Sequence, residues 1–393
     1  KDIFDNLKVS TGEKEMSTTM ALVRMLTNLL RDKNVAPRLV PIIPDEARTF
    51  GMEGFFQKIG IYAHEGQKYE PEDSAQLSSY REDKKGQVLE EGINEAGAMS
   101  SWIAAGTSYT NHDIEMIPIY LFYSMFGFQR IGDLAWAAGD SRTRGFLLGA
   151  TAGRTTLNGE GLQHEDGHSH LLSATIPNCV SYDPCFSYEL AVIIQHGLHR
   201  MVEQQEDVYY YITLMNENYS HPDMPKDIEQ QIIKGMYLIQ NTTLKSKQKV
   251  QLMGSGVILR EALEAATLLE ADWNIAADVW SVTSFTEVRR NALEVERHNM
   301  LNPLDPKKSF IQEQITDSES PIIASTDYMK SFADQVSNFI PNHFVSLGTD
   351  GYGRSDSREA LRSFFEVDRY YIVIAALKAL SDQNKIDVSM VAD

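Results

Sequence analysis

Apolar and polar residues follow each other along the chain with two spacings, one typical of buried strands and one typical of helices. Short runs that are almost entirely apolar, such as Arg38–Pro44, Met116–Tyr123 and Gly145–Ala150, predict strands buried on both faces. Ser17–Arg31 instead carries its apolar residues at helical spacing, behind Ser and Thr residues suited to cap a helix. Further strands are predicted at 174–182, 208–215, 250–254, 278–282, 321–325 and 344–347, and further helices at 95–105, 135–138, 187–202, 259–273 and 370–380. Such strands alternating with helices predict an α/β protein with doubly wound, mostly parallel sheets.

A change in composition divides this pattern into two domains. Pro222 and Pro225, followed by the polar stretch 241–249, indicate a linker around one helix. We therefore predict a first domain over 1–224, a linker over 225–249 and a second domain over 250–393. Inside the first domain, the polar segment 64–85 predicts a long mobile loop. Loops of this length in compact domains are usually functional lids or disordered spacers.

Charge and composition narrow the class of protein. The formal net charge of −19 at pH 7 disfavours a nucleic-acid partner, which would select a basic surface. The sequence holds no apolar run long enough to span a membrane and does not open with a secretory signal peptide, so we expect no membrane segment. Its two cysteines, Cys179 and Cys185, are expected in the core and fit a reduced cytoplasm.

The densest chemistry lies in Leu157–His170, whose sequence LNGEGLQHEDGHSH holds three histidines, three acids and three glycines. Glycines let the backbone approach a ligand, and His, Glu and Asp supply protons and metal ligands, so this segment predicts a catalytic loop. Two alternatives remain open. The segment can be an ordinary solvated loop, or His164 and His168 can belong to the zinc-protease pattern H-E-x-x-H. That pattern requires a helix, which Asp166 and Gly167 disfavour.

Several acids and aromatic residues follow the predicted strands, where α/β sheets place their ligands. These candidates are Asp45, Glu46, Glu95, Tyr123, Phe126, Glu160, His164 and Asp166. A glutamate against an aromatic wall can pass a proton near neutrality. Each residue alone has a simpler interpretation, because acids also cap turns and pair with helix dipoles.

Two glycine-rich turns also follow predicted strands. Gly254-Ser255-Gly256 precedes a helix, but Leu259 stands where a dinucleotide fingerprint has its third glycine. In the second turn, 348–354, Asp350 and Arg354 offer groups for an ion or a partner. No Walker lysine follows either turn, so we favour structural turns, the second at a domain or subunit contact.

Four long motifs carry a family resemblance. GINEAGAMSSW at 92–102, the segment 117–140, GRTTLNGEGLQHEDGHSH at 153–170 and LGTDGYGRSDSREALR at 347–362 closely resemble bacterial homodimeric pyruvate dehydrogenase. This family is the thiamin-diphosphate-dependent first component of the pyruvate dehydrogenase complex. The resemblance implies a transketolase-like plan in which this chain supplies the middle, aminopyrimidine-binding domain and the C-terminal domain. The family's G-D-G motif, which holds the cofactor diphosphate through magnesium in an N-terminal domain, is absent from this sequence, so we expect the chain alone to be inactive.

The resemblance also assigns roles to residues. Glu95 matches the glutamate that hydrogen-bonds the aminopyrimidine ring, favouring the imino tautomer that activates the cofactor, and His164 matches a histidine facing the substrate. Glu46, Tyr123, Phe126 and Glu160 match residues of the pyrimidine and substrate cleft. The 64–85 segment, with His64, Lys68, Tyr69 and Lys85, matches a mobile loop that orders over bound intermediate. No metal ligand is expected in this chain.

The activity implied is oxidative decarboxylation of pyruvate and transfer of the acetyl group to a lipoyl domain of dihydrolipoamide acetyltransferase. A cytoplasmic homodimer is expected. Two other classes remain open: another thiamin-dependent enzyme, such as a transketolase or a 2-oxoglutarate dehydrogenase, and a non-catalytic assembly subunit.

Overall fold

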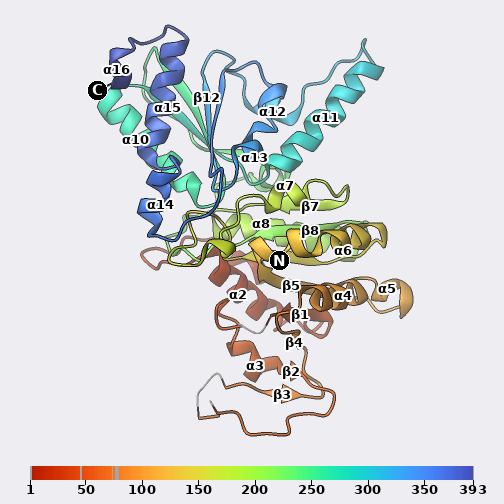
Figure 1. The fold of residues 1–393 in the computed structure, drawn as a ribbon. Coiled ribbons are helices and arrows are strands. Elements are labelled where there is room, and N and C mark those ends of the chain that lie inside the picture. Colours follow the sequence, from red (N-terminus) through yellow and green to blue (C-terminus); the bar gives the residue numbers. More distant parts are fainter. Residues whose placement is uncertain (1, 45–46, 73, 76–78, 393) are drawn as a thin grey trace. The chain divides into compact units, whose positions relative to one another are not determined.

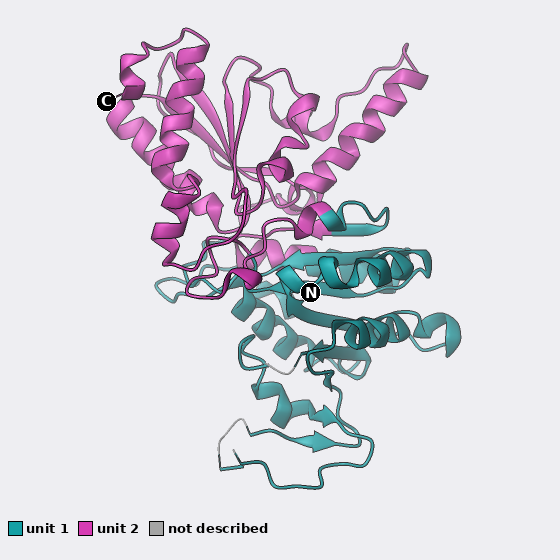
Figure 2. Cartoon of the chain, in the orientation of Figure 1, with its two compact units in different colours: residues 1–152, 172–180, 194–223 teal, residues 153–171, 181–193, 224–393 magenta. Residues whose placement is uncertain are grey.

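The computed structural model describes residues 2–44, 47–72, 74–75 and 79–392. The chain forms two compact units that interleave along the sequence (Figure 2). Unit 1 consists of residues 1–152, 172–180 and 194–223, and unit 2 consists of residues 153–171, 181–193 and 224–393. The histidine-rich loop therefore belongs to unit 2, although it lies within the first predicted domain. The predicted domain boundaries themselves stay a prediction.

A six-stranded sheet organises the first part of the chain (Figure 1). Its strand order is β4-β1-β5-β6-β8-β7. The strands are β1 (Leu39–Ile43), β4 (Leu89–Glu90), β5 (Ile117–Tyr123), β6 (Phe146–Ala150), β7 (Cys179–Tyr182) and β8 (Tyr209–Thr213). β1 pairs in parallel with β4 and β5, and β6 pairs in parallel with β5 and β8. The parallel sheet predicted from the continuous apolar runs is confirmed for these strands.

One helix of unit 1, α4, packs small residues and a tryptophan against this sheet. The helices of this unit are α1 (Asp2–Asp5), α2 (Thr18–Leu29), α3 (Gly54–Ile59), α4 (Glu95–Gly106), α5 (Ser108–Asn111) and α6 (Phe128–Asp140). α4 contacts both β5 and α6. In the core between them, the indole of Trp102 donates a hydrogen bond to the Phe146 carbonyl at 3.0 Å, and Phe122 stacks on Tyr211. The Trp102 hydrogen bond thus joins α4 directly to β6.

Unit 2 is built on a five-stranded sheet with the order β13-β12-β10-β11-β9. Its strands are β9 (Tyr237–Gln240), β10 (Lys249–Gly254), β11 (Ala276–Ser281), β12 (Ile322–Ser325) and β13 (Phe344–Leu347). β10, β11, β12 and β13 pair in parallel, while β9 runs antiparallel to β11. The helices from here to the C-terminus are α9 (Glu229–Lys234), α10 (Ile258–Trp273), α11 (Phe285–Leu301), α12 (Phe310–Gln314), α13 (Lys330–Asp334), α14 (Arg358–Phe364), α15 (Arg369–Asp382) and α16 (Ser389–Ala392).

Several details differ from the sequence prediction, three of them in longer or better-defined segments. β9 lies inside the segment predicted as a linker, because the buried Tyr237 anchors it to the sheet of unit 2. The strand predicted at 174–182 is formed only over Cys179–Tyr182. α11 was not predicted, although Phe285, Val288 and Ala292 stand at helical spacing and are buried in it. Ser284 caps it by accepting a hydrogen bond from the Glu287 amide.

Two helices take residues from both units, α7 (Ser169–Ser173) and α8 (Ser187–Leu198). In the segment predicted as a mobile loop, Glu82–Asp83 forms the short strand β3, which pairs in parallel with β2 (Ile61–Tyr62). Within the described part of the chain, every helix is too short or too polar to cross a lipid bilayer.

Candidate active site

Glu95 is the first residue of α4, held there by an N-terminal cap. The side-chain oxygen of Asn94 accepts a hydrogen bond from the Gly97 amide at 3.0 Å, which satisfies one of the free amides at the helix start. A carboxylate at this position is stabilised by the positive end of the helix dipole. The Glu95 side chain is 20% exposed, so it is largely removed from bulk water while remaining reachable by a ligand.

An arginine that the sequence did not suggest connects Glu95 to the aromatic candidates. Arg130 on α6 donates to Oε1 of Glu95 at 2.5 Å. Its guanidinium carbon lies 4.0 Å from the ring centre of Phe126, which meets Tyr123 edge to face at 6.2 Å. Tyr123 in turn packs against Phe50 at 5.3 Å. Unit 1 therefore brings Glu95, Tyr123 and Phe126 into one cluster of a carboxylate, a cation and aromatic rings.

The charge of Glu95 also affects the core behind it. Burial raises the pKa of Tyr120 on β5, and the negative charge of Glu95 raises it further. The phenol therefore stays protonated at neutral pH.

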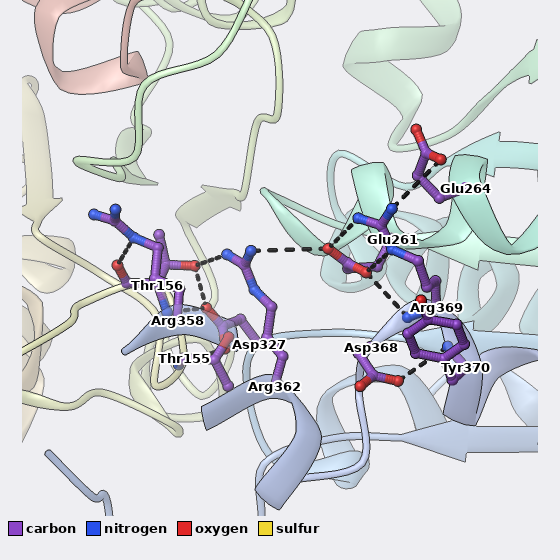
Figure 3. A network of polar contacts seen from close by, with 10 residues as sticks. All are labelled: Thr155, Thr156, Glu261, Glu264, Asp327, Arg358, Arg362, Asp368, Arg369 and Tyr370. Carbon is purple, nitrogen blue, oxygen red and sulfur yellow. Dashed lines mark hydrogen bonds and ion pairs between the residues drawn. The ribbon is translucent and has the colours of Figure 1, made fainter. Parts of the chain in front are cut away.

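The loop that carries the histidines is fixed in unit 2 by a buried carboxylate (Figure 3). Oδ1 of Asp327 accepts from the backbone amide of Thr155 at 2.8 Å and from its hydroxyl at 2.7 Å. Oδ2 accepts from the amide of Thr156 at 3.1 Å and from its hydroxyl at 2.5 Å. Burial raises the pKa of Asp327, while the charge of Arg362 and the hydrogen bonds from the Thr156 and Thr155 hydroxyls and the Thr155 amide oppose that rise. Asp327, which follows β12, thus holds the start of the histidine loop at the end of that strand.

These contacts of Asp327 with Thr155 and Thr156, called here the Asp327 clamp, are joined through Arg362 to a chain of ion pairs in unit 2 (Figure 3). Nη2 of Arg362 lies 3.4 Å from Oγ1 of Thr156, and its Nη1 lies 3.8 Å from Oε1 of Glu261. Arg369 closes the chain by donating to both oxygens of Glu261, at 2.9 and 3.2 Å. Buried pairs of this kind depend on each partner, because removing one leaves the other charge uncompensated.

The three histidines of the loop have different environments. His164 ends the short 3₁₀ turn Leu162–His164; its side chain is 25% exposed, with Nδ1 3.9 Å from Oε2 of the exposed Glu160. His170 is buried between Phe332, at 4.7 Å, and Tyr328, at 4.9 Å. Burial lowers the pKa of His170 to about 4, so this imidazole is a neutral core residue at pH 7. His168 lies between them, half-buried.

The segment His164–His168 does not form an α-helix, since residues 165–168 have no helical assignment. The geometry that H-E-x-x-H needs, with both histidines on one helical face, is therefore not formed. Across the described ranges, no group of three or more His, Cys, Asp or Glu side chains is placed to hold a metal ion. Asp166 is structural here: its Oδ1 accepts from the amides of His168 and Ser169, both at 2.9 Å, before α7.

Glu165, next to His164, is fully buried and was not among the sequence candidates. Its Oε2 accepts a hydrogen bond from the Arg354 amide at 2.6 Å. Burial raises the pKa of Glu165 to about 7, and the Arg354 amide and the charge of Arg154 offset only part of that rise. Its neighbours in sequence are polar and glycine-rich, so the sequence carried no signal of burial.

Replacing Glu165 by glutamine is expected to change the pH dependence of stability. The pKa in the folded state, about 7, exceeds the ordinary value of 4.5, so the folded chain keeps a proton that the unfolded chain releases. The stability from this proton is complete below the ordinary pKa and is lost as pH rises through 7. Glutamine cannot ionise, so the variant lacks this loss. Its free energy of unfolding relative to wild type should therefore rise by about 2–3 kcal/mol from pH 5 to pH 8.

Urea unfolding of both proteins at the two pH values measures this change. His170 contributes with the opposite sign between its lowered and ordinary pKa, but both proteins contain it and its effect cancels. Glu160→Gln, at an exposed glutamate of the same loop, serves as the control and should shift the unfolding free energy by less than about 0.5 kcal/mol. A Glu165→Gln difference that stays constant with pH would refute the prediction.

Both glycine-rich turns are held by polar side chains of the protein itself. At the Gly254–Gly256 turn, Oδ2 of Asp183 accepts from the Ser255 hydroxyl at 2.9 Å. A Cβ at Gly256 would lie 2.6 Å from the same oxygen, so the protein's own carboxylate fills this site. At the second turn, Nη1 of Arg154 donates to the carbonyls of Thr349 and Gly351. This turn is a structural contact within unit 2.

The remaining residues predicted from the sequence lie either on the exposed 64–85 segment or outside the described residues. Asp45 and Glu46 lie outside the described residues. His64, Lys68, Tyr69 and Lys85 are exposed. Lys68 pairs with Glu65, and Tyr69 donates to Glu82 at 3.2 Å. The structure thus groups Glu95, Tyr123 and Phe126 in unit 1, and places His164 beside Glu160 in unit 2.

The fold is that of the transketolase class. A transketolase from Campylobacter jejuni superposes with a TM-score of 0.69 at 15% identity, over 95% of this chain and 49% of that chain. A split-gene transketolase described as an inactive β4 tetramer superposes with a TM-score of 0.61 at 16% identity, over 93% of this chain and 98% of that chain. At such identities the likeness concerns the fold alone, and it confirms the predicted fold class.

The sequence itself matches two family models, the pyruvate dehydrogenase E1 component middle domain over residues 2–222 and the transketolase-like TK C-terminal domain over 235–368. The chain therefore belongs to the pyruvate dehydrogenase E1 component family, as the middle and C-terminal domains of that component. The pyruvate dehydrogenase E1 component of Pseudomonas aeruginosa is 62% identical over 98% of this chain and 44% of that protein. The one of Escherichia coli K12 is 58% identical over 97% of this chain and 43% of that protein. The resemblance seen in the motifs is confirmed, and the chain spans less than half the length of these relatives.

Proposed function

We propose that this chain supplies the aminopyrimidine-binding and C-terminal parts of an enzyme that decarboxylates pyruvate with thiamin diphosphate and transfers the acetyl group to a lipoyl domain of dihydrolipoamide acetyltransferase. The observation that carries the proposal is the Glu95 cluster. It combines a largely buried carboxylate at a helix start with an arginine partner and two neighbouring aromatic rings. The names of the relatives, at 58% identity and above, supply the substrate.

The residues present fit the aminopyrimidine half of the cofactor. When bound, thiamin diphosphate supplies the stabilised carbanion needed to cleave the bond to the carboxyl group of pyruvate. In this chain, Glu95 would hold or exchange a proton at a ring nitrogen, and Tyr123 and Phe126 would form the wall that excludes water. His164 would face the substrate beside Glu160, and Glu46 would complete the cleft.

We propose that magnesium and the diphosphate are held by polypeptide other than these 393 residues, because the G-D-G motif is absent from the sequence. Residues 1–224 would form the pyrimidine-binding domain and 250–393 the C-terminal domain, with 225–249 between them. The enzyme would act as a homodimer, and the 64–85 loop would close over bound intermediate. The isolated chain would be inactive.

Reconstitution tests this function. The chain is mixed with the cofactor-binding N-terminal part of the Pseudomonas relative, thiamin diphosphate, magnesium and a lipoyl domain, and acetylation is followed by mass spectrometry. Pyruvate should give an acetylated lipoyl domain, whereas 2-oxoglutarate and a ketose phosphate should give no acyl transfer; the chain alone is the control. Preference for another donor would identify a different thiamin enzyme. A lack of transfer from every donor would favour a non-catalytic assembly subunit.

A further inference from the structure

His164 stands where the loop passes from solvent to core. Residues 158–163 are exposed, while residues 165–167 are buried. Between them, the imidazole sits at the end of a 3₁₀ turn of three residues, an element too short to fix a side chain by itself. Glu165 is the first buried residue after this turn, so its contacts bear directly on how the backbone that carries His164 is held.

Glu165 provides that anchor through its side chain. The carboxylate is fully buried, and its Oε2 accepts from the Arg354 amide at 2.6 Å. The approach depends on Gly353, because a Cβ there would lie 2.6 Å from the same oxygen. A carboxyl oxygen accepts a hydrogen bond whether or not the group is ionised, so this contact can hold the turn in both protonation states.

Arg154 fixes the backbone of the same residue. Its Nε lies 3.4 Å from the Glu165 carbonyl, while its Nη1 donates to the Gly351 carbonyl at 2.6 Å. Both the main chain and the side chain of Glu165 are thus tied to the 349–354 turn. Six residues earlier, the Gly159 amide donates to the Asp356 carbonyl at 3.1 Å, which adds a further tie between the loop and unit 2.

We infer that Glu165 is a positioning residue that acts through His164: its carboxylate holds the 162–165 turn against the backbone of 353–354, so that the imidazole keeps one orientation. The inference rests on the proposed role of His164 beside the substrate. A displacement of about 1 Å in a catalytic group lowers rates by up to a hundredfold, so loss of the anchor should be visible in kcat.

The test uses the reconstituted enzyme with pyruvate and compares single and double variants. Glu165→Ala should lower kcat by about ten- to a hundredfold. Glu165→Gln keeps an acceptor for the Arg354 amide and should stay within about threefold of wild type. In a His164→Ala background, Glu165→Ala should change kcat by less than about twofold, because the group it positions is gone.

Gly353→Ala disturbs the hydrogen bond between Glu165 and the Arg354 amide while leaving Glu165 in place. It therefore tests the inference even if Glu165→Ala fails to fold. It should lower kcat about as much as Glu165→Ala. Asp317→Ala is the matched control, since that carboxylate also accepts backbone amides in a turn of unit 2, those of Glu319 and Ser320. It should leave kcat unchanged.

The outcomes separate this inference from the proposed function. If His164→Ala lowers kcat but Glu165→Ala and Gly353→Ala do not, only the positioning role is overturned. Additive effects in the double variant would also overturn it, because a general structural defect acts independently of His164. If His164→Ala leaves kcat unchanged, the role of His164 fails and the inference fails with it, while acetyl transfer from pyruvate by the wild type still supports the proposed reaction.

Discussion

Replacing Glu95 by alanine in the reconstituted enzyme is expected to lower kcat for pyruvate by at least about a hundredfold. A positioned group that exchanges a proton contributes typically 10²- to 10⁴-fold. Glu95 has the features of such a group: a capped helix start fixes its backbone, and Arg130 fixes its carboxylate at 2.5 Å. Glu95→Gln should lose nearly as much, because an amide retains the shape of the side chain but cannot exchange the proton.

Glu287 offers a matched control for this measurement. It lies in the first turn of α11, pairs with Arg290 at 2.8 Å, and its side chain is 21% exposed, against 20% for Glu95. Glu287→Ala therefore removes the same kind of helix-start carboxylate and should leave kcat within about twofold of wild type. Equal rates for wild type and Glu95→Ala would remove Glu95 from the chemistry.

The elements that hold the Glu95 cluster could be predicted from the sequence. β5 is buried along almost its whole length, so its apolar run gave its position directly. The predicted start of α4 at Glu95 agrees with the structure, whereas its cap, Asn94, was not predicted. Arg130 could not be found in this way, because an exposed arginine on a helix has no distinguishing pattern, and its partner is 35 residues away.

The anchors of the histidine loop show a second limit of sequence reasoning. Glu165 and Asp327 occur in polar stretches that suggest solvated side chains, yet both are fully buried. Their burial is stable because backbone amides and threonine hydroxyls supply the hydrogen bonds that water would otherwise make. Those donors come from segments up to 189 residues distant, a pairing that only tertiary structure creates.

Replacing Asp327 by alanine is expected to destabilise unit 2 by about 3–5 kcal/mol, because the Asp327 clamp is lost. The change removes the acceptor for four donors on Thr155 and Thr156, all buried. It also leaves the buried guanidinium of Arg362 with less compensating charge. Asparagine keeps one acceptor oxygen and turns an amide toward the remaining donors, so it should recover only part of the loss.

Hydrogen exchange followed by mass spectrometry, together with urea unfolding, measures this effect. The amides of Thr155 and Thr156 should exchange at least about a hundredfold faster in Asp327→Ala, since about 3 kcal/mol of protection is lost. Asp334→Ala is the control: that exposed aspartate accepts a hydrogen bond from Ser346, and its loss should alter stability by less than about 1 kcal/mol. Unchanged exchange at Thr155 and Thr156 in Asp327→Ala would show that Asp327 does not hold the start of the loop. In that case the anchor next to His164, rather than the clamp at the start of the loop, would determine the geometry of the candidate active site.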